Sequence, residues 1–159
     1  MLKQKKIRVL VNIVILCLFC KDYNFILITG GDYLVEINGR CLNVYGQGAL
    51  RFIDKSWDTD KANDVNIVKF NYVQYNGIAV TLNKLKQRFP NAEHFYFKET
   101  NISHLGQLNA LAEVQGLKSM FIEAEGNPII SKNWKVYAIY RLAHWGLKTV
   151  NGVEVNFIE

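Results

Sequence analysis

Three cysteines are the residues best suited to redox or metal chemistry. Cys17 and Cys20 form a Cys-x-x-Cys pair, and Cys41 lies farther along the chain. A redox pair needs an accessible, activated thiolate, whereas these two lie in the apolar run 7–20. A zinc site would need two further ligands, for which Cys41 and three scattered histidines are the candidates. We interpret the cysteines as reduced, buried side chains and expect no metal site.

The histidines are the candidates for acid–base catalysis. None of His94, His104 and His144 is paired with a Ser or Cys in a recognisable catalytic motif. His94 is expected on a strand, and the other two at helix ends. Glu123 and Glu125 are close in sequence, but no second carboxylate can be placed opposite them. We predict that the chain is not an enzyme and uses no cofactor.

Two ligand-binding motifs begin in the sequence but are not completed. The glycines of segment 46–48 open like a dinucleotide-binding loop, but Arg51 replaces the third glycine and no helical pattern follows. The acidic stretch 54–64 resembles the start of a calcium loop, but Ala62 and Lys69 occupy ligand positions. We predict a solvated connecting loop there.

Composition indicates one globular unit. Half of the 159 residues are hydrophobic and 21% are charged, which is enough for one domain with a core. The formal net charge is +5, but four of the basic residues lie in the segment 1–8, which contains no acidic residue. A nucleic-acid-binding surface needs basic residues distributed over the folded body. We therefore expect no nucleic-acid partner.

The first 29 residues differ from the rest. A basic start precedes the apolar run 7–20, as in a signal peptide, but no small-x-small cleavage site follows. The run is shorter than the ~18 residues that a membrane-spanning helix requires. Three interpretations remain: a buried strand, a leader foreign to the domain, or a working signal. The first two are favoured over the third.

Segment 30–64 is predicted to hold a β-hairpin or meander and the acidic loop. Two short apolar stretches, 34–37 and 41–44, flank Asn38-Gly39, the dipeptide typical of a type I′ hairpin turn. A third strand is expected at 49–53.

Segment 65–126 repeats one hydrophobic pattern three times. Its frames are Val65-x-x-Val68-x-Phe70, Ala92-x-x-Phe95-x-Phe97 and Leu117-x-x-Met120-x-Ile122, at steps of 27 and 25 residues. This period is typical of leucine-rich repeats. We predict an α/β leucine-rich-repeat solenoid, a short, curved parallel sheet with helices on its convex side, preceded by a small antiparallel β section.

Helical patterns separate the frames. The first helix is predicted to start at Asn76 or Gly77 and to end before Pro90. The second is predicted to follow a cap at Ser103 and to end near Gly116. The inward-facing residues of the two helices are Ile78, Leu82, Leu85 and Phe89, then Leu105, Leu108, Leu111 and Ala112.

Segment 127–159 resembles the C-terminal cap of leucine-rich-repeat proteins. The residues that fall on the pattern are Asn127, Pro128, Tyr140, Arg141, Leu147 and Gly152. Departures are Val150-Asn151 where Leu-Asp is usual, and the turn 144–146. A helix opened by Ser131 and a closing strand are expected to cover the last repeat.

From about residue 30 to residue 155 the chain resembles the C-terminal part of the leucine-rich-repeat subunits of tubulin polyglutamylase complexes. The resemblance is carried by LVEINGRCLNVYGQGALRFIDK and NAEHFYFKETNISHLGQLNALAEVQGL. It implies a non-catalytic scaffold in the cytoplasm, associated with the microtubule cytoskeleton, centrosome or cilium. The implied partners are other subunits of a tubulin-modifying complex, and tubulin itself, with no small-molecule substrate.

A secreted or membrane-tethered repeat ectodomain is the alternative. It would use the first 20 residues as a leader, and a glycan on Asn101, in the sequon 101–103, would distinguish it from the cytoplasmic scaffold.

The partner-binding surface is predicted on the concave face of the sheet, where alternate strand residues point outward. The candidates are Lys69, Asn71, His94, Tyr96, Lys98, Phe121 and Glu123. Tyr96 beside Phe121 would form an exposed aromatic pair, the kind of anchor that dominates interfaces. Alternatively, Phe121 is covered by the cap.

Overall fold

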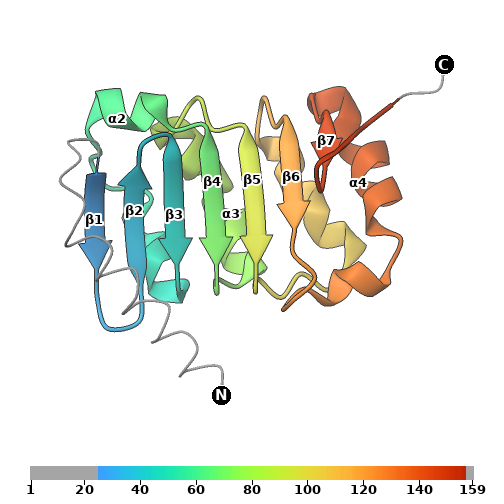
Figure 1. The fold of residues 1–159 in the computed structure, drawn as a ribbon, viewed down its shortest axis with the longest axis horizontal. Coiled ribbons are helices and arrows are strands. Elements are labelled where there is room, and N and C mark those ends of the chain that lie inside the picture. Colours follow the sequence, from blue (N-terminus) through green and yellow to red (C-terminus); the bar gives the residue numbers. More distant parts are fainter. Residues whose placement is uncertain (1–24, 157–159) are drawn as a thin grey trace.

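A computed structural model describes residues 25–156, which form a single eight-stranded sheet in sequential order (Figure 1). The strands are β1 Phe25–Thr29, β2 Leu34–Asn38, β3 Cys41–Tyr45, β4 Ile67–Asn71, β5 His94–Lys98, β6 Ser119–Ile122, β7 Thr149–Val150 and β8 Val153–Glu154. Strands β3 to β7 run parallel, and an antiparallel section flanks them at each end. Residues 1–24, with the apolar run and the Cys-x-x-Cys pair, lie outside the described residues.

Helical segments connect the parallel strands and lie on one face of the sheet (Figure 1). They are η1 Gln47–Phe52, α2 Thr59–Asp64, α3 Tyr75–Arg88, η2 Leu105–Glu113, η3 Pro128–Ser131, α4 Trp134–Leu142 and η4 Ala143–Trp145. We call the opposite face, which bears Lys69, Tyr96 and Phe121, the open face. No helix in the described part of the chain is long and apolar enough to cross a membrane.

The core consists of side chains stacked strand by strand. Each of the three predicted frames contains a strand, whose apolar residues point toward the helices. The first residue of each frame lies just before its strand, and these residues, Val65, Ala92 and Leu117, are buried as well. The two inward rows are Leu42, Val68, Phe95, Met120 and Val150, then Val44, Phe70, Phe97 and Ile122. Each large apolar side chain contributes roughly 1.5–3 kcal/mol by its burial. Parallel, in-register pairing places like residues of successive repeats in contact, so the repeats bury one another.

The parallel ladder starts one strand before the first predicted repeat. β3 pairs with β4 in parallel, as β4 does with β5, and the first residues of the three strands are aligned with one another. Amide side chains repeat in the same way, 27 residues apart: the Gln74 N–H donates to Gln47 Oε1 at 2.9 Å, and Asn101 Nδ2 donates to Gln74 Oε1 at 3.2 Å. The second strand of the hairpin, β3, is therefore also the first strand of the parallel ladder.

The two predicted helices differ in kind. The first is confirmed as α3, with all four predicted residues buried and its end at Arg88, but it begins at Tyr75, earlier than predicted. The second is a 3-10 helix, η2, in which only Leu108 and Leu111 are fully buried. The chain between β5 and β6 is shorter than that between β4 and β5. A 3-10 helix rises farther per residue, so it spans the repeat with fewer residues.

Two predictions for the N-terminal section are wrong in detail. The hairpin loop is Gly39-Arg40, and only Gly39 has a positive φ, of 57°. Glycine at the first of two loop positions is typical of a type II′ turn, not type I′. The stretch predicted as a third strand, 49–53, lies mostly in η1. Because β3 and β4 are parallel, the chain must cross over on the helical face between them.

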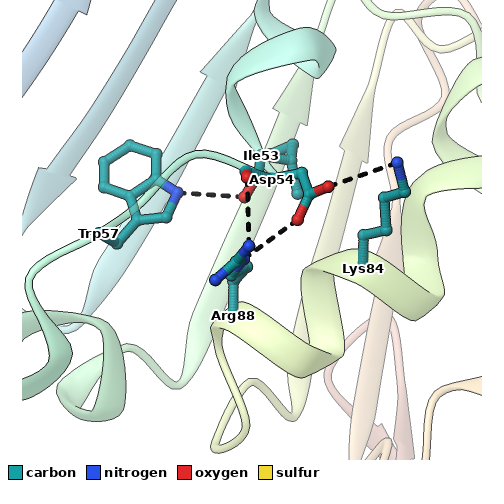
Figure 2. Close-up of polar contacts among 5 residues, drawn as sticks. All are labelled: Ile53, Asp54, Trp57, Lys84 and Arg88. Carbon is teal, nitrogen blue, oxygen red and sulfur yellow. Dashed lines mark hydrogen bonds and ion pairs between the residues drawn. The ribbon is translucent and has the colours of Figure 1, made fainter.

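The acidic stretch is not a freely solvated loop. Asp54 accepts a hydrogen bond from Arg88 Nε at 3.1 Å and forms an ion pair with Lys84 Nζ at 3.4 Å. Trp57 Nε1 donates to the Ile53 carbonyl at 3.1 Å. Figure 2 shows how these side chains meet. The Arg88 hydrogen bond, with that of Lys84, lowers the pKa of Asp54. These contacts attach the loop to α3.

The same stretch contains a short helix, α2. Its N-cap residue Asp58 accepts a hydrogen bond from the Lys61 N–H at 3.0 Å, the usual arrangement for an N-terminal cap. Ala62 is buried and joins the core. An alanine that would disable a calcium loop is thus a core residue here.

Asn127 connects the last two repeats from a buried position. Its Oδ1 accepts from Thr100 Oγ1 at 2.7 Å and from the Ile102 N–H at 3.1 Å. Its Nδ2 donates to the carbonyls of Glu123 at 2.9 Å and Phe97 at 3.3 Å. One side chain therefore satisfies four polar groups where the strands end and water is excluded.

The C-terminal section covers the last full repeat. Helix α4 begins at Trp134, after Asn133, rather than at Ser131, which lies in η3. Beyond β7, Asn151 completes the edge: its Oδ1 accepts from the Ile122 N–H at 2.8 Å and its Nδ2 donates to the Ile122 carbonyl at 3.0 Å. An aspartate, usual in the cap pattern, could not donate the second bond. Asn151, at the position where aspartate is usual, therefore satisfies both backbone groups of Ile122.

We predict that Asn127→Ala lowers the free energy of unfolding by about 3 kcal/mol, because the substitution leaves several buried groups without partners. Urea denaturation would measure the change. The control is Asn91→Ala, which removes one exposed hydrogen bond to the Asn63 carbonyl and should cost less than about 1 kcal/mol. Equal losses in the two variants would contradict the role given to Asn127.

Tyr75 generates a second prediction. Its ring packs edge-on against Phe97 at 5.6 Å, but within residues 25–156 its buried hydroxyl has no hydrogen-bond partner, and burial raises its pKa. Tyr75→Phe keeps the ring and removes an unsatisfied group, so stability should stay unchanged or increase. Thermal denaturation would test this, with Tyr137→Phe, which loses a hydrogen bond to Asn109, as the destabilised comparison.

Candidate functional site

The open face brings together the aromatic pair predicted from the sequence. Lys69, Tyr96 and Phe121 are direct neighbours across β4, β5 and β6. The rings of Tyr96 and Phe121 stack with centroids 5.6 Å apart and planes 20° apart, and Lys69 Nζ lies 5.5 Å from the Tyr96 centroid. Tyr96 is 38% exposed and Phe121 37%, so the cap does not bury Phe121.

Charged residues border this pair toward the carboxyl ends of the strands. Lys98 Nζ and Glu123 Oε1 form an ion pair at 3.5 Å, and both side chains are partly exposed. Asn71 pairs in register with Lys98, but it is only 8% exposed, and its Nδ2 has no hydrogen-bond partner among the residues that the structure describes. Asn71 thus offers a partner little surface, whereas the ion pair is accessible.

His94 lies on the same face at the opposite ends of the strands. Its Nδ1 is 2.7 Å from Ser119 Oγ, and its Nε2 is 3.8 Å from Glu93 Oε1. The second distance is too long for a hydrogen bond. The Ser119 N–H is already donated to the Glu93 carbonyl, so it does not serve as an oxyanion donor. This resembles a catalytic triad in residue types but not in geometry.

A cavity of about 440 Å³ lies beside His94. Its lining residues are His94, Lys118, Ser119, Leu147, Lys148, Thr149, Glu154 and Val155. Lys98 and Glu123, which an acid–base site including His94 would need, are not among them. The cavity therefore does not join the histidine to the ion pair. Within the described residues, no group of three or more His, Cys, Asp or Glu is arranged to hold a metal ion.

Sequence reasoning missed one residue of the row. Asn43 on β3 is the in-register neighbour of Lys69, and its Nδ2 donates to Glu36 Oε1 at 2.7 Å. It extends the row beside the aromatic pair by a polar side chain. The repeat frame is present in the sequence as Gly39-x-x-Leu42-x-Val44, but it is hard to recognise because a glycine occupies the first apolar position of the frame. Cys41, on the same strand, has its pKa raised mainly by burial.

The fold and this face define an α/β repeat protein with an accessible row of side chains along its parallel strands. Over 124 residues the chain is 40% identical to leucine-rich repeat-containing protein 49 of Homo sapiens and to its Mus musculus counterpart. The aligned region is 77% of this chain but 18% of each relative. This homology supports a leucine-rich-repeat protein. No family model matches the chain.

The ion pair between Glu93 and Lys118, next to His94, leads to a prediction about how stability depends on pH. A hydrogen bond from Lys118 is the main cause that lowers the pKa of Glu93. A carboxylate with a lowered pKa stabilises the fold above its unfolded-state pKa, and the stabilisation is lost as pH falls through the folded-state value. Glu93→Gln should therefore reduce stability at neutral pH and make the acid-side loss shallower.

Urea denaturation between pH 7 and pH 3 would measure this effect. Glu113→Gln, at an exposed position in η2, is the control and should leave the profile close to that of the wild type. Parallel profiles for the wild type and Glu93→Gln would contradict the assignment.

Proposed function

We propose that the chain is a non-catalytic scaffold that binds a protein partner through the open face. The observation that carries the proposal is the stacked, half-exposed pair Tyr96 and Phe121 on neighbouring strands. Aromatic side chains supply a large contact area at low entropic cost, and they are typical of the residues that dominate protein interfaces.

The surroundings of the pair fit this role. Lys69 lies against the Tyr96 ring, and the Lys98–Glu123 ion pair lies one row away. An apolar centre bordered by accessible charges is the usual composition of a transient interface. The charges would select the partner and orient it, while the rings would contribute most of the affinity. His94 would form the opposite border.

We further propose that the sheet curves as a short solenoid, with the open face concave. The support is the homology to a leucine-rich-repeat protein together with the in-register parallel stacking of β3 to β7. Repeat proteins of this class use an extended concave surface for binding.

The assembly we propose is a tubulin polyglutamylase complex in the cytoplasm, on microtubules, at the centrosome or in the cilium. This rests on the sequence resemblance described above. The chain would dock other subunits, or tubulin, and the ligase chemistry would belong to a separate tubulin-tyrosine-ligase-like subunit. The leucine-rich-repeat relatives span much more sequence than this chain, so the proposal concerns the part they share.

Affinity purification of the tagged, full 159-residue chain from ciliated-cell cytosol, followed by mass spectrometry, tests the proposed binding surface and the proposed assembly. We expect the wild type to recover a tubulin-tyrosine-ligase-like enzyme with its companion subunits. Tyr96→Ala with Phe121→Ala should reduce that recovery by at least about tenfold, as expected for loss of two central aromatic residues, without changing the far-UV circular dichroism spectrum.

The matched control is Tyr96→Phe with Phe121→Tyr, which keeps both rings and should keep the binding. Undiminished recovery with the double alanine variant would contradict the open face as the binding surface. Recovery of chaperones alone by the wild type would contradict a scaffold role for this chain in the polyglutamylase complex.

A further inference from the structure

The C-terminal section has a charge distribution unlike that of the rest of the domain. Residues 127–156 contain four basic residues, Lys132, Lys135, Arg141 and Lys148, and one acidic residue, Glu154, whereas residues 25–126 contain ten basic and eleven acidic residues. Asp54, Glu93 and Glu123, which form ion pairs, all lie before residue 127. The excess positive charge of the described domain is therefore concentrated at one end.

Exposed apolar side chains occur in the same section. Val136 is 60% exposed and Tyr140 77%, and they lie one turn apart on α4. Residues four positions apart lie on the same helix face, so the two form a continuous ridge. Trp145, in η4 directly after this helix, is 49% exposed and its ring packs against His144. The opposite face of α4 carries the buried residues Trp134, Ala138 and Leu142.

The basic residues flank this ridge. At 100° per residue, Lys135 and Arg141 project on opposite sides of the Val136–Tyr140 line. Asn109 Oδ1 holds the helix in place, because it accepts from Tyr137 at 2.9 Å and from Arg141 Nε at 3.0 Å. The arrangement is an apolar strip between two cationic borders on a helix attached to η2.

We propose that this surface of α4 and η4, which we call the cap surface, binds an acidic polypeptide segment that carries apolar side chains between its carboxylates. Carboxylates would lie against Lys135 and Arg141, and the apolar side chains against Val136 and Tyr140. Helix faces with this pattern are typical of protein docking. The cap surface lies at the end of the row of strands (Figure 1), and Tyr96 and Phe121 are not part of it.

An acidic polypeptide fits better than a nucleic acid. Nucleic-acid binding depends on many phosphate contacts from a basic stripe, and the section has four cations, of which Arg141 and Lys132 already hydrogen-bond to Asn109 and to the Ser103 carbonyl. Two large, exposed apolar side chains between the charges would contact no phosphate. They are suited to a partner that buries apolar surface.

Fluorescence anisotropy with the full chain and a labelled glutamate–tyrosine copolymer tests the proposal. We expect binding that weakens as salt rises, and weaker binding of polyaspartate, which has charge but no apolar anchor. Lys135→Glu with Tyr140→Ser should raise the Kd at least about tenfold. Arg40→Glu with Val80→Ser makes the same change in net charge and removes one exposed apolar residue elsewhere; its Kd should stay within about twofold.

Each other outcome would overturn the proposal. Absence of binding by the wild type, or equal weakening in both double variants, would show that the cap surface does not recognise acidic polypeptides. Tighter binding of an oligothymidylate or of phosphatidylserine vesicles, lost in the cap variant only, would assign the surface to a nucleic acid or to a membrane. Tyr96→Ala with Phe121→Ala should bind the copolymer normally, so the result is independent of the open face.

Discussion

The structure depends on one constraint: each parallel strand can bury its apolar side chains only if the next strand joins it in register. Residues of the sheet alternate between the two faces, so a slip of one residue would exchange Phe70 and Phe97 for Lys69 and Tyr96. The stacked core therefore determines which side chains reach solvent. The row on the open face is a direct consequence of the packing on the other face.

Asparagine side chains satisfy the backbone groups that the stacked strands leave without hydrogen-bond partners. Where strands end, backbone groups lose their ladder partners, and Asn127 satisfies them between two repeats while Asn151 satisfies Ile122 at the edge of the sheet. Both residues act as donor and acceptor at once, which a carboxylate or a hydrophobic side chain cannot do. Helix α4, on which the exposed apolar ridge lies, is held by its contacts with η2, where Asn109 accepts hydrogen bonds from Tyr137 and Arg141.

The binding roles proposed for this chain rest on two surfaces of different chemistry. The open face combines stacked aromatic rings with charges of both signs, Lys69, Lys98 and Glu123. The cap surface combines an apolar ridge with positive charge alone. A protein with two such surfaces is suited to holding two partners at a fixed separation, which is what a scaffold does. His94 contacts Ser119 at 2.7 Å and so joins β5 to β6, whereas Glu93 Oε1 lies 3.8 Å from its ring, too far for a hydrogen bond.

The three repeat frames, the inward face of α3 and the exposed aromatic pair could be predicted before folding was considered, because they depend on residue period and on side-chain alternation. Tertiary structure decided the rest. The stretch 49–53 is helical because β3 already occupies the strand position, and a parallel neighbour requires a crossover. Asn71 is buried, and Asp54 is held by α3, because of neighbours remote in sequence. Local pattern cannot report contacts between residues that only the folded chain brings together.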